Sequence, residues 1–179
     1  MKPSARLTYR PLAVGDAEAV HSYQSLEHAV RYVPFGARDL DQVREALGRQ
    51  VSNPALTEVG QFVIYGAWND SGRLVGQFNL GVDQLDPKSG SFGYLVHPDF
   101  WRQGFAREAS IALLTHAFEE RGFERVTAVI DVRNEPSIRL AEGLGMRREA
   151  THIDHARLKG ELVSEHTYAL LAREWTTRP

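Results

Sequence analysis

Cysteine is absent from the 179 residues of the chain, so disulfide bonds, thiolate metal sites and a cysteine nucleophile are excluded. The chain lacks a run of about eighteen apolar residues, and residues 1–10 lack the apolar segment of a secretory signal, so we expect a cytoplasmic protein. Neither a Walker-type phosphate loop nor a dinucleotide-binding glycine fingerprint occurs. With a formal net charge of −2, we expect neither nucleic acid nor a membrane as partner.

The composition that remains fits one globular domain. Hydrophobic residues make up 42% of the chain and charged residues 25%, which is enough to bury a sizeable core. No internal repeat, low-complexity tract or linker divides the sequence. We therefore predict a single domain over residues 1–179.

Hydrophobic periodicity predicts an α/β fold. Strands are expected at residues 7–12, 61–68, 73–80, 91–97 and 126–132, and helices at 16–25, 39–51, 104–121 and 134–145. Turn residues at 69–72 and 85–90 join the second, third and fourth strands into an antiparallel meander. The helix between the fourth and fifth strands predicts a right-handed βαβ unit, and a closing hairpin turns at residues 158–161.

The stretch Tyr94-Leu-Val-His-Pro-Asp-Phe-Trp-Arg-Gln-Gly-Phe-Ala-Arg-Glu-Ala109 runs from an apolar strand through a glycine turn into a long helix. The first amides of a helix have no intrahelical acceptor and lie at the positive end of its dipole, so they can bind a phosphate. Gly104 would let the backbone approach that phosphate closely. A single glycine at such a junction is also compatible with ordinary turn chemistry.

A second helix start follows the next strand. Asn134 is a suitable N-cap, Pro136 fits the first turn, and Gly145 can end the helix in a left-handed conformation. Ligands of open α/β sheets bind at the carboxyl ends of the strands, where both helix starts lie. We therefore expect the two motifs to converge in space.

Together these motifs resemble the GNAT superfamily of N-acetyltransferases. Its phosphate loop has Gln or Arg, two variable residues, Gly, one variable residue, and Gly or Ala; residues 101–106 match except that Trp101 stands first. Tryptophan there resembles the branch that includes the ribosomal-protein-alanine N-acetyltransferases. Further matches cover nearly the whole chain: Leu7-Thr-Tyr-Arg-Pro-Leu12, Phe92-Gly-Tyr94, Arg107-Glu-Ala109, Asn134-x-x-Ser137, Gly143-Leu-Gly-Met-Arg-Arg-Glu149 and Tyr168-Ala-Leu-Leu-x-x-Glu-Trp175.

The resemblance implies a GNAT-like mixed sheet with an antiparallel meander, two splayed central parallel strands and flanking helices. It also implies acetyl-CoA as co-substrate, with no metal. The pyrophosphate would bind the loop amides, and the peptide-like pantetheine arm would pair with the strand edge near residues 95–97. The predicted cofactor-binding residues are Leu95, Val96, Arg102, Gln103, Gly104, Phe105, Ala106, Arg107, Asn134 and Ser137.

For catalysis, the resemblance implies that Ser137 protonates the departing thiolate and that a backbone amide around Tyr94 to Val96 stabilises the oxyanion. Ser137 could equally be a solvent-facing residue of the first helical turn, and Arg102 and Arg107 could simply be solvated. Relatives that act on ribosomal proteins carry a glutamate where the alignment places Ala156, so the general base stays open between Asp154, His155, Glu165, His166 and water.

The region of residues 152–155 could suggest a metal site. Regular strand alternation places His152 and Asp154 on one face and His155 on the other, which argues against it. For the acceptor pocket we expect walls formed by Tyr32 and Phe35, by Tyr94 and by His155, although such aromatic residues are also typical of a core.

The sequence thus predicts an acetyl-CoA-dependent N-acetyltransferase that acts on a primary amine, of a protein or peptide N-terminus or of a small molecule, by direct attack in a ternary complex. The alternatives are an acyltransferase that uses another acyl-CoA, and a CoA-binding sensor or interaction module on the same scaffold. The acceptor, the acyl preference and the oligomeric state, a homodimer among the options, are left open.

Overall fold

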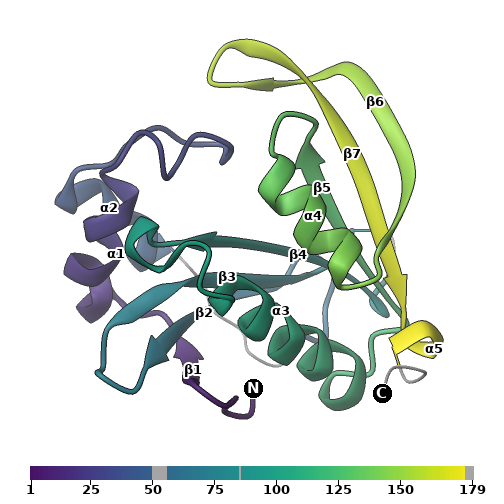
Figure 1. The fold of residues 1–179 in the computed structure, drawn as a ribbon, viewed down its shortest axis with the longest axis horizontal. Coiled ribbons are helices and arrows are strands. Elements are labelled where there is room, and N and C mark those ends of the chain that lie inside the picture. The colour runs from purple at the N-terminus through teal and green to yellow at the C-terminus, as the bar shows by residue number, and fades with distance from the viewer. Residues whose placement is uncertain (50–55, 85, 176–179) are drawn as a thin grey trace.

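The computed structural model describes residues 1–49, 56–84 and 86–175. Within them, seven strands form one sheet in the order β1-β2-β3-β4-β5-β7-β6, flanked by helices (Figure 1). The strands are β1 (Leu7–Pro11), β2 (Phe62–Asn69), β3 (Leu74–Val82), β4 (Ser89–Val96), β5 (Arg125–Asp131), β6 (Arg147–Leu158) and β7 (Glu161–Leu171). The helices are α1 (Ala17–Gln24), α2 (Leu40–Arg49), α3 (Phe105–Thr115), α4 (Glu135–Gly143) and α5 (Ala172–Trp175).

The predicted meander and βαβ unit are both present. Strands β2, β3 and β4 pair antiparallel, and β4 pairs parallel with β5 after the chain has passed through α3. The turn between β6 and β7 forms where predicted, with positive φ at Lys159 (51°) and Gly160 (89°). Two consecutive residues with positive φ give the turn a twist that matches the right-handed twist of the flanking strands. The expected helical residue Val51 and turn residue Leu85 lie outside the described residues.

The two central parallel strands splay, as the resemblance implied. They pair at three positions, from Ser89↔Arg125 to Ser91↔Thr127, although β4 continues to Val96 and β5 to Asp131. Beyond those pairs the strands diverge, and α4 lies beside β5 (Figure 1). We call the space between the diverging strands the β4–β5 gap.

Each face of the sheet has its own buried cluster. The larger one contains Leu113 and Leu114 of α3, both fully buried, with Leu144 after α4 and Phe78 and Phe92 of the sheet. Burying such a leucine contributes about 1.5–3 kcal/mol. The second cluster lies beneath α1 and α2 and includes Val20, Tyr23, Val43, Leu47 and Leu95. Along β4, alternate residues therefore serve different layers.

Two elements differ from expectation. The helix predicted to Arg121 is α-helical only to Thr115 and continues as the π-helical turn η3 (His116–Glu120). We attribute the wider turn to His116, whose buried ring contacts Glu120 at 2.8 Å and the Tyr65 hydroxyl at 3.1 Å.

The strand alternation expected at residues 152–155 is wrong. Between the pairs His152↔Glu165 and Ala156↔Val163, three residues of β6 lie opposite one residue of β7, and Asp154 has a φ of 46°. Such a bulge re-aims side chains, and the rings of His152 and His155 lie 4.8 Å apart. No group of three or more His, Cys, Asp or Glu side chains suited to a metal ion occurs among the described residues.

None of the helices in the described segments is both long and apolar enough to cross a membrane.

Candidate active site

The predicted anion loop begins α3 without a side-chain cap. Gly104 is the N-cap residue, with φ 81° and ψ −4°, and no side chain accepts a hydrogen bond from the first turn. Arg102 also has a positive φ, 59°, with Gln103 between the two. Alternation of left-handed and right-handed backbone turns successive N–H groups toward one point. The loop therefore has the form of an anion-binding concavity, and residues 101–104 are exposed.

The N-terminal segment braces this loop. The carboxylate of Glu108 in α3 accepts hydrogen bonds from Ser4 Oγ at 2.7 Å and from Arg6 N and Nε at 2.8 and 2.7 Å. Arg6 Nη1 also donates to the carbonyl of Gln103 at 3.1 Å, and its guanidinium lies 4.2 Å from the centre of the Phe105 ring. Burial alone would raise the pKa of Glu108, but the hydrogen bonds from Ser4 and Arg6 lower it overall.

Sequence reasoning missed this brace. Arg6 and Glu108 are about a hundred positions apart, so no local pattern links them. The available signal was a glutamate in the first turn of a helix, which is typical of the positive end of the dipole and points to no particular partner.

The edge of β4 that faces the gap is identified by the pairing on its other side. His97 N donates to Val75 O at 2.9 Å and Asp83 N donates to Ser89 O at 2.8 Å, so odd-numbered residues of β4 bond to β3. Alternation then directs the N–H groups of Tyr94 and Val96 toward the gap. The Val96 carbonyl accepts from Trp101 Nε1 at 2.8 Å, which ties the loop to the strand end. Leu95, by contrast, pairs with Gln77 of β3.

At the start of α4, the candidate functional groups are the side chains of Asn134 and Ser137. Asn134 caps α4, with Oδ1 3.4 Å from Ser137 N, and its carbonyl accepts from the same amide at 3.1 Å. The Ser137 hydroxyl lies 2.8 Å from the hydroxyl of Tyr94, so a helix start and a strand across the gap are joined. Burial raises the pKa of Tyr94, which keeps its hydroxyl protonated at neutral pH.

Tyr32 and Phe35, both predicted to line the acceptor pocket, contact different parts of the protein. Tyr32 donates to the carbonyl of Arg133, directly before the cap of α4, at 3.1 Å. Phe35 packs against the α1–α2 cluster, and the Arg38 guanidinium lies 3.7 Å from its ring centre. Lys159 in the β6–β7 turn donates to Val30 O at 2.8 Å, which links this turn to the segment that carries both aromatic residues.

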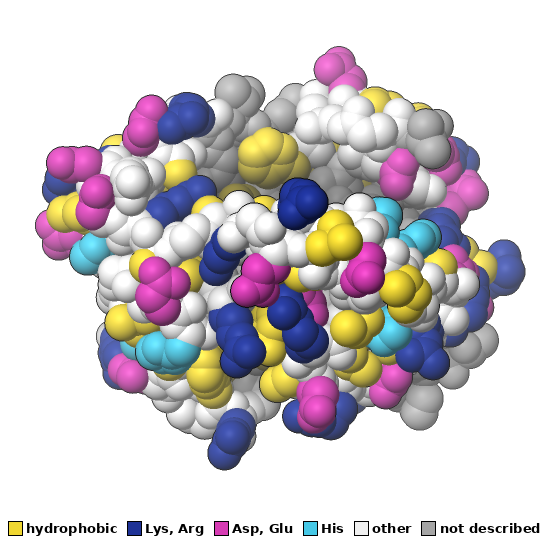
Figure 2. All heavy atoms as spheres, turned by 90° about the horizontal axis from the view of Figure 1, so that it is seen from above, with side chains coloured by type: hydrophobic (Ala, Val, Ile, Leu, Met, Phe, Trp, Pro, Cys, Tyr) yellow, Lys and Arg dark blue, Asp and Glu magenta, His cyan; other side chains and the backbone are white. Residues whose placement is uncertain are grey.

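The candidate bases lie on the closing hairpin. His155 Nδ1 is 3.3 Å from Glu165 Oε2, His166 Nδ1 is 2.9 Å from Thr151 Oγ1, and Asp154 Oδ1 accepts from Ser164 at 3.3 Å. On the face seen from above, acidic, basic and histidine side chains are interspersed with hydrophobic ones (Figure 2). Sequence reasoning did not consider His97 as a base. This residue directly follows β4, and burial lowers the pKa of its ring, which favours the neutral form.

The sequence profile of the acetyltransferase (GNAT) domain matches residues 6–147, which include the loop, both helix starts and the splayed strands. The chain belongs to the GNAT acetyltransferase family. It is 28% identical over 176 residues to the uncharacterized N-acetyltransferase p20 of Bacillus licheniformis, covering 95% of each chain. It is also 33% identical over 105 residues to YdaF, a candidate ribosomal N-acetyltransferase of Bacillus subtilis, covering 58% of this chain and 57% of YdaF.

Solved GNAT structures agree with the fold. A GNAT-family acetyltransferase from Bacillus anthracis matches with a TM-score of 0.85 at 26% identity, covering 96% of this chain and 98% of the other. The spermidine N-acetyltransferase of Vibrio cholerae, solved with CoA and spermine, matches with a TM-score of 0.82 at 18% identity, covering 97% and 99%. The family and these relatives make the chain an N-acetyltransferase.

GNAT enzymes use acetyl-CoA, and the local structure fits that molecule. At Gly104 an added Cβ would meet only Arg6 Nη2 within 4 Å, at 3.5 Å, so no other non-neighbouring group crowds the loop at this point. The gap-facing amide of Val96 provides a strand edge for a peptide-like arm. The loop and this edge are joined through Trp101.

Proposed function

We propose that this GNAT enzyme transfers the acetyl group of acetyl-CoA to a primary amine by direct attack in a ternary complex. One observation carries the proposal: an uncapped helix start with a left-handed glycine is hydrogen-bonded, through Trp101, to the end of a strand whose edge faces the gap. One elongated ligand can then place its pyrophosphate on the loop and its amide-bearing arm along the strand.

The geometry supports the following binding roles. The amides of residues 103–107 would bind the pyrophosphate, with Arg102 and Arg107 adding charge. The gap-facing backbone of Tyr94 and Val96 would serve the arm, with one of these two amides pairing with it and the other donating to the reacting carbonyl oxygen. Removal of such a donor costs about 10²–10³ in rate in other enzymes. Asn134 would donate to the arm through its side-chain amide, because its Oδ1 faces Ser137 N.

The hydroxyl pair of Ser137 and Tyr94 suits proton delivery to the departing thiolate. Ser137 would give its proton to sulfur and recover one through the Tyr94 hydroxyl, 2.8 Å away, which in turn regains a proton from solvent, so that both hydroxyls end protonated. Since a free thiol has a pKa of about 8.5, the leaving group needs only modest assistance.

The acceptor would enter beside Tyr32, Phe35 and His155, and we retain Asp154, His155, Glu165, His166 and water as bases. The His155–Glu165 contact has the arrangement of a base oriented by a carboxylate.

We also propose a cytoplasmic, single-domain enzyme without a nucleic-acid or membrane partner, and leave a homodimer open.

A thiol-release assay that crosses an acyl-CoA panel with a panel of amines tests the proposal. The panel should contain peptides with free N-termini, polyamines and aminoglycosides. We expect release from acetyl-CoA that depends on one class of amine. Faster release from succinyl-CoA would favour a different acyltransferase. Tight CoA binding in calorimetry without release for any pair would favour the sensor or interaction module.

A further inference from the structure

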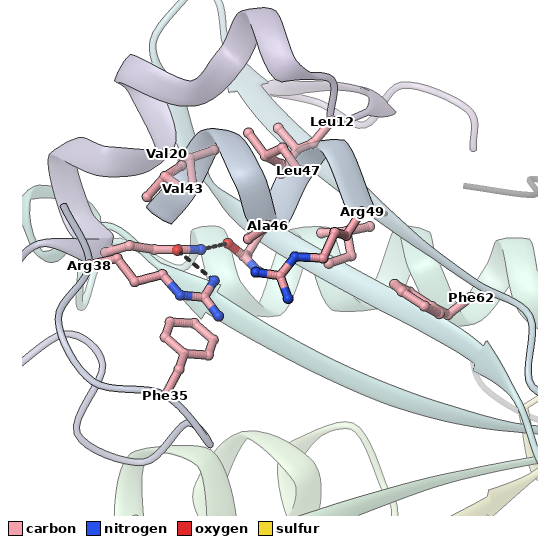
Figure 3. A pocket seen from close by; sticks show the side chains of 12 residues that line it. Leu12, Val20, Phe35, Arg38, Val43, Ala46, Leu47, Arg49 and Phe62 are labelled. Carbon is pink, nitrogen blue, oxygen red and sulfur yellow. Dashed lines mark hydrogen bonds between the residues drawn. The ribbon is translucent and has the colours of Figure 1, made fainter. Parts of the chain in front are cut away.

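A cavity lies away from the anion loop, between helices α1 and α2 and strands β2 and β3. Its volume is about 260 Å³. The walls are mostly apolar and include Leu12, Val20, Val43 and Leu47 (Figure 3). Ile64 of β2 also lines the cavity. An adjoining hollow shares Phe35, Arg38, Ala46 and Arg49 with it. A space of this size accommodates a molecule smaller than most drug-like ligands.

Arg38 is one of two arginines that line this cavity, and its guanidinium has spare donors. Arg38 Nη1 donates to Gln24 Oε1 at 3.2 Å, and the group stacks 3.7 Å from the Phe35 ring centre. Gln24 is fixed in turn by its bond to Gln77 at 2.8 Å. Among the described residues, no carboxylate lies within ion-pair distance of Arg38. A guanidinium carries five donors, so most of them are available to a ligand.

A second guanidinium increases the positive charge at the cavity. Arg49, at the end of α2, lines the same space and pairs with Glu45 at 2.7 Å. Two arginines are thus balanced by one carboxylate among the described lining residues. Burial lowers the pKa of Arg38, and the charge of Arg49 lowers it further. A partly desolvated cation beside a like charge is stabilised by an anion that bridges the two.

We propose that this cavity binds a small organic carboxylate with an apolar body. The carboxylate meets Arg38 in the planar, two-bond geometry that guanidinium groups favour, with Arg49 at its other side. The body lies against the apolar wall beneath α2, held by contact with Val43 and Leu47. The site is distinct from the pyrophosphate loop and does not depend on the proposed acetyl transfer. A polyamine would be repelled by the same two arginines.

Calorimetry with matched ligand pairs tests this site. The probes are hexanoate and phenylacetate, each compared with its neutral amide, titrated into the full chain. We expect at least one carboxylate to bind at or below about millimolar Kd, and its amide to bind about ten-fold more weakly or worse. Failure of both carboxylates to bind at ten times that concentration, or equal affinity of carboxylate and amide, overturns the proposal.

Three variants locate the binding. Arg38→Gln should weaken the carboxylate about ten-fold, whereas Arg44→Gln, which removes an exposed arginine of α2 paired with Asp41, should leave its affinity unchanged. Ala46→Leu fills the cavity without changing charge and should abolish binding. Each variant must retain the wild-type melting temperature within a few degrees, with Arg38→Lys replacing Arg38→Gln if the latter unfolds. Equal affinity in Arg38→Gln and Arg44→Gln contradicts the assignment.

Two sources could supply such a carboxylate, and kinetics separates them. Because Phe35 also belongs to the proposed acceptor wall, the carboxylate could be part of the acceptor itself. Competition between the bound carboxylate and the acceptor amine assigns it to the acceptor. Binding without competition assigns it to a separate small molecule.

Discussion

The two helices that begin beside the β4–β5 gap differ in whether their first backbone amides have hydrogen-bond acceptors within the protein. At α4, Asn134 caps the helix, Pro136 removes one N–H, and Ser137 N has acceptors on Asn134. At α3, Gly104 supplies no cap, and the backbone is left-handed at two of the three residues 102–104. The first helix therefore offers backbone donors to a ligand, and the second offers side chains. Substitutions at the start of α3 should therefore impair acetyl-CoA binding, and substitutions at the start of α4 should impair the chemical step.

Gly104→Val should have the largest effect. A β-branched residue at a φ of 81° is strained, so the loop must change its path. We expect the Kd for acetyl-CoA, measured by calorimetry, to rise about a hundred-fold or more. Gly122→Val is the control, because Gly122 has a φ of 69° near the other end of the same helical segment and nothing within 4 Å of its Cβ position. Unchanged affinity in a folded Gly104→Val variant would remove the loop from the site.

Ser137→Ala should act on the chemical step. Loss of a proton donor to the leaving thiolate should lower kcat by about ten- to a hundred-fold and leave the KM for acetyl-CoA within about two-fold. Tyr94→Phe, which keeps the ring but removes the hydroxyl bonded to Ser137, should show a smaller loss. If kcat of Ser137→Ala equals that of wild type, Ser137 serves only the helix.

Arg6→Gln should weaken acetyl-CoA binding without slowing chemistry, because Arg6 positions the loop through Glu108 and Gln103. We expect KM for acetyl-CoA to rise about five-fold at constant kcat. Arg10→Gln is closely matched: Arg10 lies four residues away and pairs with Asp16, with side chains 53% and 13% exposed against 46% and 16% for Arg6 and Glu108. An equal rise in KM in both variants would point to a general loss of stability.

The smallest expected effect is on the stability of the protein in acid. The pKa of Glu108 lies below its ordinary value in the folded chain, because the bonds from Ser4 and Arg6 outweigh burial. Its stabilising contribution is therefore complete above the unfolded pKa and disappears as the pH falls through the folded value. The difference in unfolding free energy between wild type and Glu108→Gln should be on the order of 1 kcal/mol at pH 7 and shrink toward pH 3. Glu119→Gln, an exposed site, should show no such trend; a constant Glu108 difference would refute the linkage.

Local signals in the sequence predicted the helix starts well. Gly104, Asn134 and the turns at residues 69–72 and 158–161 act through the conformation of a few neighbouring residues, so they can be predicted from short patterns. The splay of β4 from β5 came from the resemblance to a family, because no property of either strand alone dictates where pairing stops.

Contacts between distant residues could not be predicted in this way. The Arg6–Glu108 brace, the Tyr94–Ser137 pair and the α1–α2 cavity each join residues more than twenty positions apart. The faces expected for His152 and His155 were wrong because alternation assumes a regular strand, and the bulge at Asp154 breaks it.

The account depends most on the claim that backbone amides of the α3 start bind acetyl-CoA, and amide NMR tests this directly. In a titration of the isotope-labelled chain with CoA, the amide signals of residues 103–107 should shift most, with those of Glu135 and Ser137 shifting less. Saturable CoA binding that leaves the signals of residues 103–107 unmoved would contradict the account.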